Sequence, residues 1–154
     1  ARLPFELSWI EIEAGATIPL PATENSRHAR RVQTFATRHM KNGLSLGYNI
    51  VETRRRLKSE YSNLSQEELR TLAQRGENLS EDYDAILCSF GGDGLPLNAN
   101  DVHGAEILFH EATLLDGNDR KHQLHSTLDE AVEVARQSQV KTLILHHVSG
   151  RYRK

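Results

Sequence analysis

The sequence has little cysteine and no long apolar run. Its one cysteine, Cys88, lies between apolar neighbours, which is typical of a small buried side chain. A single cysteine cannot build a disulfide framework within one chain. No stretch approaches the roughly 18 apolar residues of a membrane span, and residues 1–4 lack the pattern of a signal peptide. We therefore expect no membrane partner and a location in the cytoplasm or an organelle interior.

Neither sign of charge predominates either. The 154 residues include 19 Lys and Arg against 21 Asp and Glu, a net charge of -2. This balance gives no hint of non-specific binding to nucleic acid, so contact with an acidic substrate would need a local basic patch. The hydrophobic share of 38% and the charged share of 26% are typical of one globular domain.

Alternating and apolar runs predict strands, and two capping boxes predict helices. Ser65 with Glu68 begins one helix, which should end at Arg75 before Gly76, and Thr127 with Glu130 begins another. Predicted strands are 5–12, 17–20, 31–38, 46–51, 84–90, 105–110 and 141–145. The strands 31–38 and 46–51 suggest a hairpin with a long connection. Strands and helices together predict a layered α/β fold.

Polar residues follow three of these strands. His39, Asp93 and His147 each come just after an apolar run. Strand ends are where layered α/β folds build their sites, and zinc takes imidazole nitrogen and carboxylate oxygen. Taken alone, a histidine at a strand end is more often a surface or core residue than a ligand, and a Gly-Asp-Gly is more often just a turn. The neighbouring His146 is not expected to be a ligand, because adjacent strand residues face opposite ways. We expect the same of His110.

Four segments in order give a stronger signal. They read Gly-Gly-Asp-Gly at 91–94, Glu-Ile-Leu-Phe-His-Glu-Ala-Thr at 106–113, His-Ser-Thr at 125–127 and Leu-Ile-Leu-His-His-Val-Ser-Gly-Arg-Tyr at 143–152. This series resembles the C-terminal block of ribonuclease Z in the metallo-β-lactamase superfamily. Upstream, Phe-Ala-Thr-Arg-His at 35–39 with Ser-Leu-Gly-Tyr at 45–48 is similar to that family's hairpin with a metal-ligand histidine. The resemblance covers about residues 5–154.

The resemblance implies an α/β fold, half of a metallo-β-lactamase αββα sandwich with a mixed sheet and flanking helices, over residues 1–154. It implies that Asp93 bridges two zinc ions, that His39 binds one and that His147 binds the other. Glu111 would orient a ligand by a hydrogen bond, and His125 would act on the scissile phosphate. The reaction would be metal-assisted phosphodiester hydrolysis, with precursor tRNA or another phosphodiester as substrate.

The sequence departs from the family in one large respect. The family's His-x-His-x-Asp-His cluster is absent, since no two of the eight histidines are two residues apart. His39, Asp93 and His147 give each zinc two ligands with one shared, whereas catalytic zinc normally has three. We therefore expect the chain alone to hold two zincs weakly and to be inactive. The N-terminal half or a partner chain would supply the rest, and a homo-oligomer is also expected. Gly94 stands where the family has threonine.

Residues 52–82 form an interval with a basic cluster and a helix. Arg54, Arg55, Arg56 and Lys58 place four cations in five residues, which could contact phosphates without reading sequence. They could equally be a solvated face.

Two classes of function remain open. The first is the C-terminal half of a zinc-dependent hydrolase acting on RNA, or on another phosphodiester or ester. The second is a degenerate or truncated relative that acts as a non-catalytic binding module. His125 could simply pack on a helix N-terminus, and Glu111 could be an ordinary carboxylate at a strand end. A half-sandwich should also expose the apolar face that its partner sheet would cover.

Overall fold

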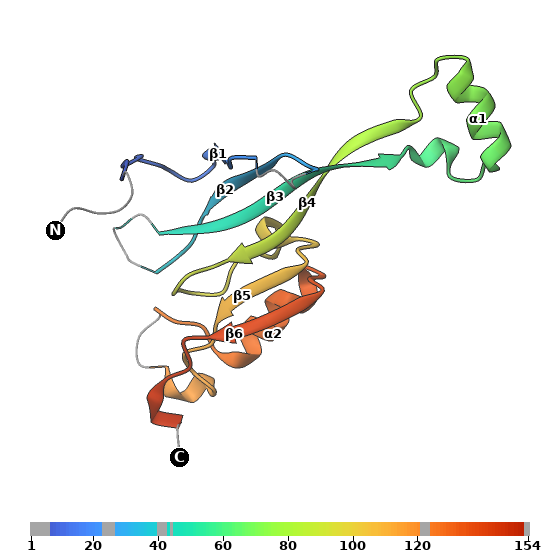
Figure 1. Ribbon diagram of the computed structural model, residues 1–154. Coiled ribbons are helices and arrows are strands. Elements are labelled where there is room, and N and C mark those ends of the chain that lie inside the picture. The colour runs from blue at the N-terminus through green and yellow to red at the C-terminus, as the bar shows by residue number, and fades with distance from the viewer. Residues whose placement is uncertain (1–6, 23–26, 40–42, 44, 121–123, 153–154) are drawn as a thin grey trace.

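A computed structural model describes residues 7–22, 27–39, 43, 45–120 and 124–152. Six strands form one sheet in the order of the chain (Figure 1). They are β1 Thr17–Pro19, β2 Arg30–Ala36, β3 Leu46–Leu57, β4 Ser80–Phe90, β5 Ile107–Glu111 and β6 Thr142–His146. The first four strands are antiparallel, and β4, β5 and β6 are parallel. The sheet is therefore mixed, as predicted.

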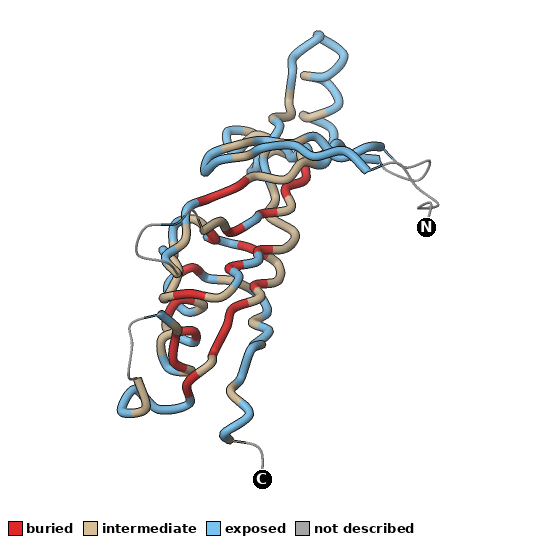
Figure 2. The backbone as a smooth tube through the Cα atoms, turned by 90° about the vertical axis from the view of Figure 1, so that its left-hand side faces the viewer, coloured by how far each residue is buried: buried red, intermediate tan, exposed pale blue. Residues whose placement is uncertain are grey.

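One face of the sheet carries the core. Helix α2, Leu128–Gln137, crosses over between the parallel strands β5 and β6. Its Val134 packs with Leu108 of β5 and with Val102 of the short helix η2, Ala99–Val102. Both capping-box hydrogen bonds between Thr127 and Glu130 are present, which confirms the predicted start of this helix. Figure 2 shows that the buried residues lie in the body of the molecule, whereas the arm is largely exposed.

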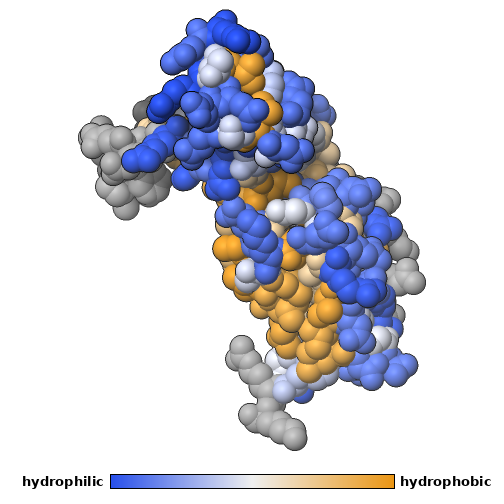
Figure 3. Space-filling model, turned by 90° about the vertical axis from the view of Figure 1, so that its right-hand side faces the viewer, coloured by the Kyte–Doolittle hydropathy of each residue, from blue (hydrophilic) through white to orange (hydrophobic). Residues whose placement is uncertain are grey.

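The opposite face is apolar and only partly covered. Strand register places Tyr48, Phe90, Phe109 and Ile144 in one row across β3 to β6. The rings of Phe90 and Phe109 stack with centroids 4.5 Å apart. Tyr48, Phe90 and Ile144 stay between 37% and 39% exposed. Figure 3 shows hydrophobic side chains gathered on the body below the arm. A half-sandwich would expose such a row, and the half-sandwich itself stays a prediction.

Strands β3 and β4 continue far beyond the other strands and form an arm (Figure 1). The short helix η1, Ser59–Tyr61, and helix α1, Gln66–Gln74, stand at its tip. Ser65 and Glu68 make the predicted capping box, and Gly76 follows the helix with a φ of 83°. None of the residues of α1 is buried, so the tip adds little to the core.

Some sequence predictions were wrong in extent or in kind. The predicted strand 5–12 is not a strand over 7–12, and Phe5 lies outside the described residues. Leu7, Trp9 and Ile10 there are 56%, 90% and 71% exposed, so the alternating pattern is not matched by burial of one face. The strands 46–51 and 84–90 are longer than predicted, since they continue into the arm as 46–57 and 80–90. Among the described residues, no helix has the length and apolar character to cross a membrane.

Candidate metal and catalytic site

The predicted site residues meet at one edge of the sheet. Strands β2, β4, β5 and β6 run in the same direction, so their carboxyl ends share that edge. His39 follows β2, Asp93 follows β4 and His147 follows β6. Glu111 ends β5 between them. The topology therefore brings together residues that are up to 108 positions apart in the sequence.

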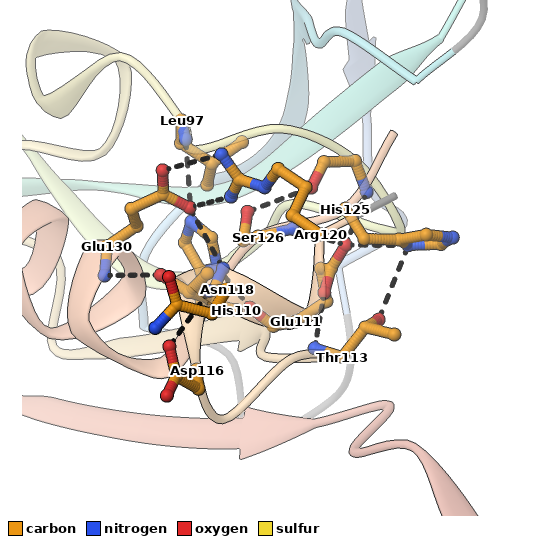
Figure 4. Close-up of polar contacts among 12 residues, drawn as sticks. Leu97, His110, Glu111, Thr113, Asp116, Asn118, Arg120, His125, Ser126 and Glu130 are labelled. Atoms are coloured by element: carbon orange, nitrogen blue, oxygen red, sulfur yellow. Dashed lines mark hydrogen bonds and ion pairs between the residues drawn. The ribbon is translucent and has the colours of Figure 1, made fainter. Parts of the chain in front are cut away.

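Glu111 is the buried centre of this edge (Figure 4). Its Oε1 accepts hydrogen bonds from the backbone N–H groups of Gly94 at 3.1 Å and Ser126 at 3.0 Å. Its Oε2 accepts one from the Thr113 N–H at 2.7 Å. Burial raises the pKa of this carboxyl, but these donors outweigh burial and leave its pKa below the ordinary value. Glu111 is thus a carboxylate held by the turns that carry the site.

The same carboxylate orients His125. The Nδ1 of His125 lies 2.9 Å from Glu111 Oε1. An ionised carboxylate only accepts hydrogen bonds, so Nδ1 carries the proton and Nε2 is left for other partners. Thr113 Oγ1 lies 3.3 Å from the same Nδ1. The His125 side chain is 28% exposed, so the ring is accessible at the surface.

His147 faces Asp93. Its Nε2 lies 3.3 Å from Asp93 Oδ2, and its Nδ1 lies 2.7 Å from Thr113 Oγ1. Two ligand atoms of one tetrahedral zinc, each about 2.0–2.2 Å from the ion, stand about 3.3–3.5 Å apart. Metal-binding histidines also usually hydrogen-bond through their second nitrogen. The pair of Asp93 and His147 therefore fits a shared zinc ion.

His39 lies beside the same turn. Its Nδ1 lies 3.1 Å from the Leu124 carbonyl oxygen, which can only accept, so Nε2 is again the free nitrogen. Its ring centroid is 5.2 Å from that of His125. A Cβ at Gly94 would come 2.8 Å from the Arg38 carbonyl oxygen. Glycine at 94 therefore lets the turn of Asp93 pack closely against the segment that carries His39.

Grouping possible metal ligands by distance alone gives a different set of residues. One possible ligand atom from each of Glu111, His125 and His147 lies within 4.8 Å of the others. Glu111 is nevertheless a poor ligand, because both of its oxygens already accept hydrogen bonds from buried backbone groups. Asp93 is 41% exposed and has an oxygen directed at His147. We therefore retain Asp93, His147 and His39 as the candidate ligands.

His110 belongs to the support of the site. It is buried, and its Nε2 accepts a hydrogen bond from the Leu97 N–H at 3.4 Å. Its Nδ1 therefore donates to the Glu111 carbonyl oxygen at 2.7 Å. Burial lowers the pKa of this imidazole. A neutral ring thus ties the segment after the Asp93 turn to β5, in keeping with the expectation that His110 is not a ligand.

Two residues of the site did not stand out in the sequence. Thr113 contacts both His125 and His147 through its hydroxyl. Ser126 donates its backbone N–H to Glu111 and its hydroxyl to the Gly94 carbonyl oxygen, at 2.8 Å. Both stand inside the quoted motifs, in the segments 106–113 and 125–127. Those positions were the only signal, because the contacts depend on tertiary structure.

The basic cluster lies apart from the site, along the arm. Each of its arginines has a carboxylate partner: Arg54 pairs with Glu52 and Glu106, Arg55 with Asp82, and Arg56 with Glu81. The hydrogen bond to Glu52, then that to Glu106, raises the pKa of Arg54. These pairs leave less free charge for phosphates than the sequence suggested. Binding of nucleic acid by Arg54, Arg55, Arg56 and Lys58 stays a prediction.

Parts of the chain are similar in sequence to proteins named ribonuclease Z. No family model matches the chain. A protein named ribonuclease Z from Metallosphaera sedula is 40% identical over 79 residues, which is 47% of this chain and 27% of that protein. Another of the same name from Gemmatimonas aurantiaca is 29% identical over 98% of this chain and 53% of that protein. The chain thus spans about a quarter of the first relative and about half of the second, and it matches the C-terminal part of such proteins.

A solved structure shares the fold. The metallo-β-lactamase fold protein YhfI from Bacillus subtilis superimposes with a TM-score of 0.51 and 14% sequence identity. The match covers 86% of this chain and 40% of YhfI. At this identity the likeness speaks for the fold alone. It confirms the predicted fold class, a mixed-sheet α/β arrangement of metallo-β-lactamase type.

Proposed function

We propose that this chain, a ribonuclease Z-like member of the metallo-β-lactamase superfamily, carries the C-terminal part of the site of a zinc-dependent phosphodiesterase that processes precursor tRNA. The observation that carries the proposal is the 3.3 Å approach of Asp93 Oδ2 to His147 Nε2. Both side chains stand at the ends of parallel strands, where such folds place their chemistry. Because relatives of the chain are named ribonuclease Z, we propose RNA rather than another phosphodiester as the substrate.

The site residues would have two different roles, metal binding and proton donation. Asp93, His39 and His147 would hold zinc, and zinc at this edge would activate water and offset the charge that develops on the phosphate. His125 presents Nε2 toward the site while Glu111 holds Nδ1. We propose that His125 donates a proton to the leaving oxygen or stabilises the phosphoryl oxygens. The buried Glu111 carboxylate keeps His125 in the required tautomer.

The ligand count calls for further residues. His39, Asp93 and His147 provide two ligands per zinc with one shared, against the three usual for catalytic zinc. We propose that the missing ligands come from a sheet that packs on the apolar row of Tyr48, Phe90, Phe109 and Ile144. Their exposure supports this, because a stable monomer rarely leaves such a row uncovered. That sheet would be the N-terminal half of the protein or belong to a partner chain.

The test uses the protein at its native length, isolated with whatever partner accompanies it. We expect it to cleave precursor tRNA in the presence of zinc, and the Asp93→Asn variant to lose about 10³-fold in rate or more. Asp82→Asn, on the arm, is the matched control: it frees Arg55 but leaves the site unchanged, so it should keep nearly the full rate at saturating precursor tRNA. Cleavage that is unaffected by Asp93→Asn would refute the proposed site. Cleavage of a simple phosphodiester but not of tRNA would refute only the substrate.

A further inference from the structure

Thr113 uses every polar group it has within the site. Its N–H donates to Glu111 Oε2 at 2.7 Å, and its carbonyl oxygen accepts from the Ser149 N–H at 3.1 Å. Its Oγ1 lies 2.7 Å from Nδ1 of His147. One residue thus joins the buried carboxylate, through its backbone N–H, to a ring that faces Asp93, through its hydroxyl.

The backbone of His147 has an unusual conformation that its neighbours hold in place. Its φ is 58°, in the left-handed region that residues other than glycine rarely adopt. The chain on both sides is attached to the segment that follows β5: the Ala112 N–H donates to the His146 carbonyl oxygen at 3.0 Å, and the Ser149 N–H donates to Thr113. These bonds fix the backbone of His147 but leave its imidazole free to rotate. Among the described residues, Thr113 and Asp93 are the two that the ring contacts through hydrogen-bonding atoms.

We propose that Thr113 is a positioning residue: its backbone N–H holds it against Glu111, and its hydroxyl sets the His147 imidazole so that Nε2 faces Asp93. The inference rests on the proposed function where it concerns zinc. When Nε2 binds a metal, Nδ1 carries the proton and donates it to Thr113 Oγ1. Glu111 thereby orients His125 directly and His147 through Thr113, whose backbone N–H it accepts.

The test compares Thr113→Val, which keeps the shape and loses the hydroxyl, with Thr113→Ser, which keeps the hydroxyl. The first measurement is the NMR order of the His147 ring in the metal-free full chain. We expect a rigid ring in the wild type and in Thr113→Ser, and a mobile ring in Thr113→Val. The second is zinc affinity by competition with a chromogenic chelator. Thr113→Val should bind zinc about 10-fold more weakly or worse, and Thr113→Ser should stay near the wild type.

The two measurements separate the inference from the proposed function. A ring that is as rigid in Thr113→Val as in the wild type would overturn the positioning role, whatever zinc does. A ring that becomes mobile only in Thr113→Val would support the positioning role of Thr113. If neither the wild type nor any variant then binds zinc, the proposed metal site is refuted while the positioning role stands. Thr113→Ala lacks the hydroxyl and needs less space, so it replaces the valine variant should that variant fail to fold.

Discussion

The arm and the site edge both concentrate charged residues, but they hold them in opposite ways. At the site edge, Glu111 is 1% exposed and accepts hydrogen bonds from three buried backbone N–H groups. On the arm, Arg55 and Asp82 lie 3.6 Å apart with both side chains about two-thirds exposed. Exposed pairs contribute little, whereas a buried carboxylate leaves several donors unsatisfied when it is removed. Charge therefore fixes the geometry of the site, whereas along the arm it forms exposed ion pairs that contribute little to stability.

The largest effect should come from removing the centre of the site. Glu111→Ala leaves three buried backbone N–H groups and the His125 ring without their acceptor, so the free energy of unfolding should fall by about 4 kcal/mol. The matched change on the arm, Glu81→Ala, breaks only the exposed pair with Arg56 and should cost less than about 1 kcal/mol. Urea unfolding of both variants measures the contrast. Equal losses would mean that burial does not distinguish the two regions.

A smaller effect should be a pH dependence of the free energy of unfolding that His110 causes. The buried ring has a lowered pKa, so the unfolded chain takes up the proton first as pH falls. The free energy of unfolding should therefore decline as pH drops below about 6.5, the ordinary pKa of histidine, until the folded ring also titrates. His110→Gln should show a weaker decline between about pH 7.5 and 5.5 than the wild type. An identical pH dependence in the two proteins would exclude His110 as the cause.

The smallest effect should come from the basic cluster. Arg55 and Lys58 are the arm cations to change, since Arg54 is tied to Glu52 and Glu106. The double change Arg55→Ala with Lys58→Ala should lower the slope of log affinity against log salt for precursor tRNA by about 1 to 2. Glu81→Gln, which frees Arg56 from its partner, should tighten binding. A slope that no arm variant alters would remove the arm from the RNA interface.

Local patterns predicted much of this molecule, and tertiary contacts explain what they missed. The capping boxes of Ser65 and Thr127 form within one helical turn, so the sequence could place both helix starts. The arm's ion pairs depend on strand register, which shifts at an irregularity between Ile50 and Val51. No local pattern shows that shift, so the pairing of Arg55 with Asp82 could not be predicted.

In the site, too, the sequence predicted the residue types but not the tertiary contacts. The resemblance named Asp93, His147, Glu111 and His125, and the strand ends do bring them together. The metal roles assigned to them remain predictions. Thr113 was missed because its importance lies in a contact with a residue 34 positions away. Residue types at strand ends can be predicted from sequence, whereas the hydrogen bonds that orient them follow only from the packing of the turns.

The most direct test of the zinc site is the intact mass of the protein from its source, with zinc measured by elemental analysis on the same sample. We expect a mass well above 17.4 kDa, or a stable complex with a second chain, carrying close to two zinc ions per site. A mass of 17.4 kDa, with no partner and no zinc, would contradict the proposal that Asp93 and His147 belong to a working metal centre.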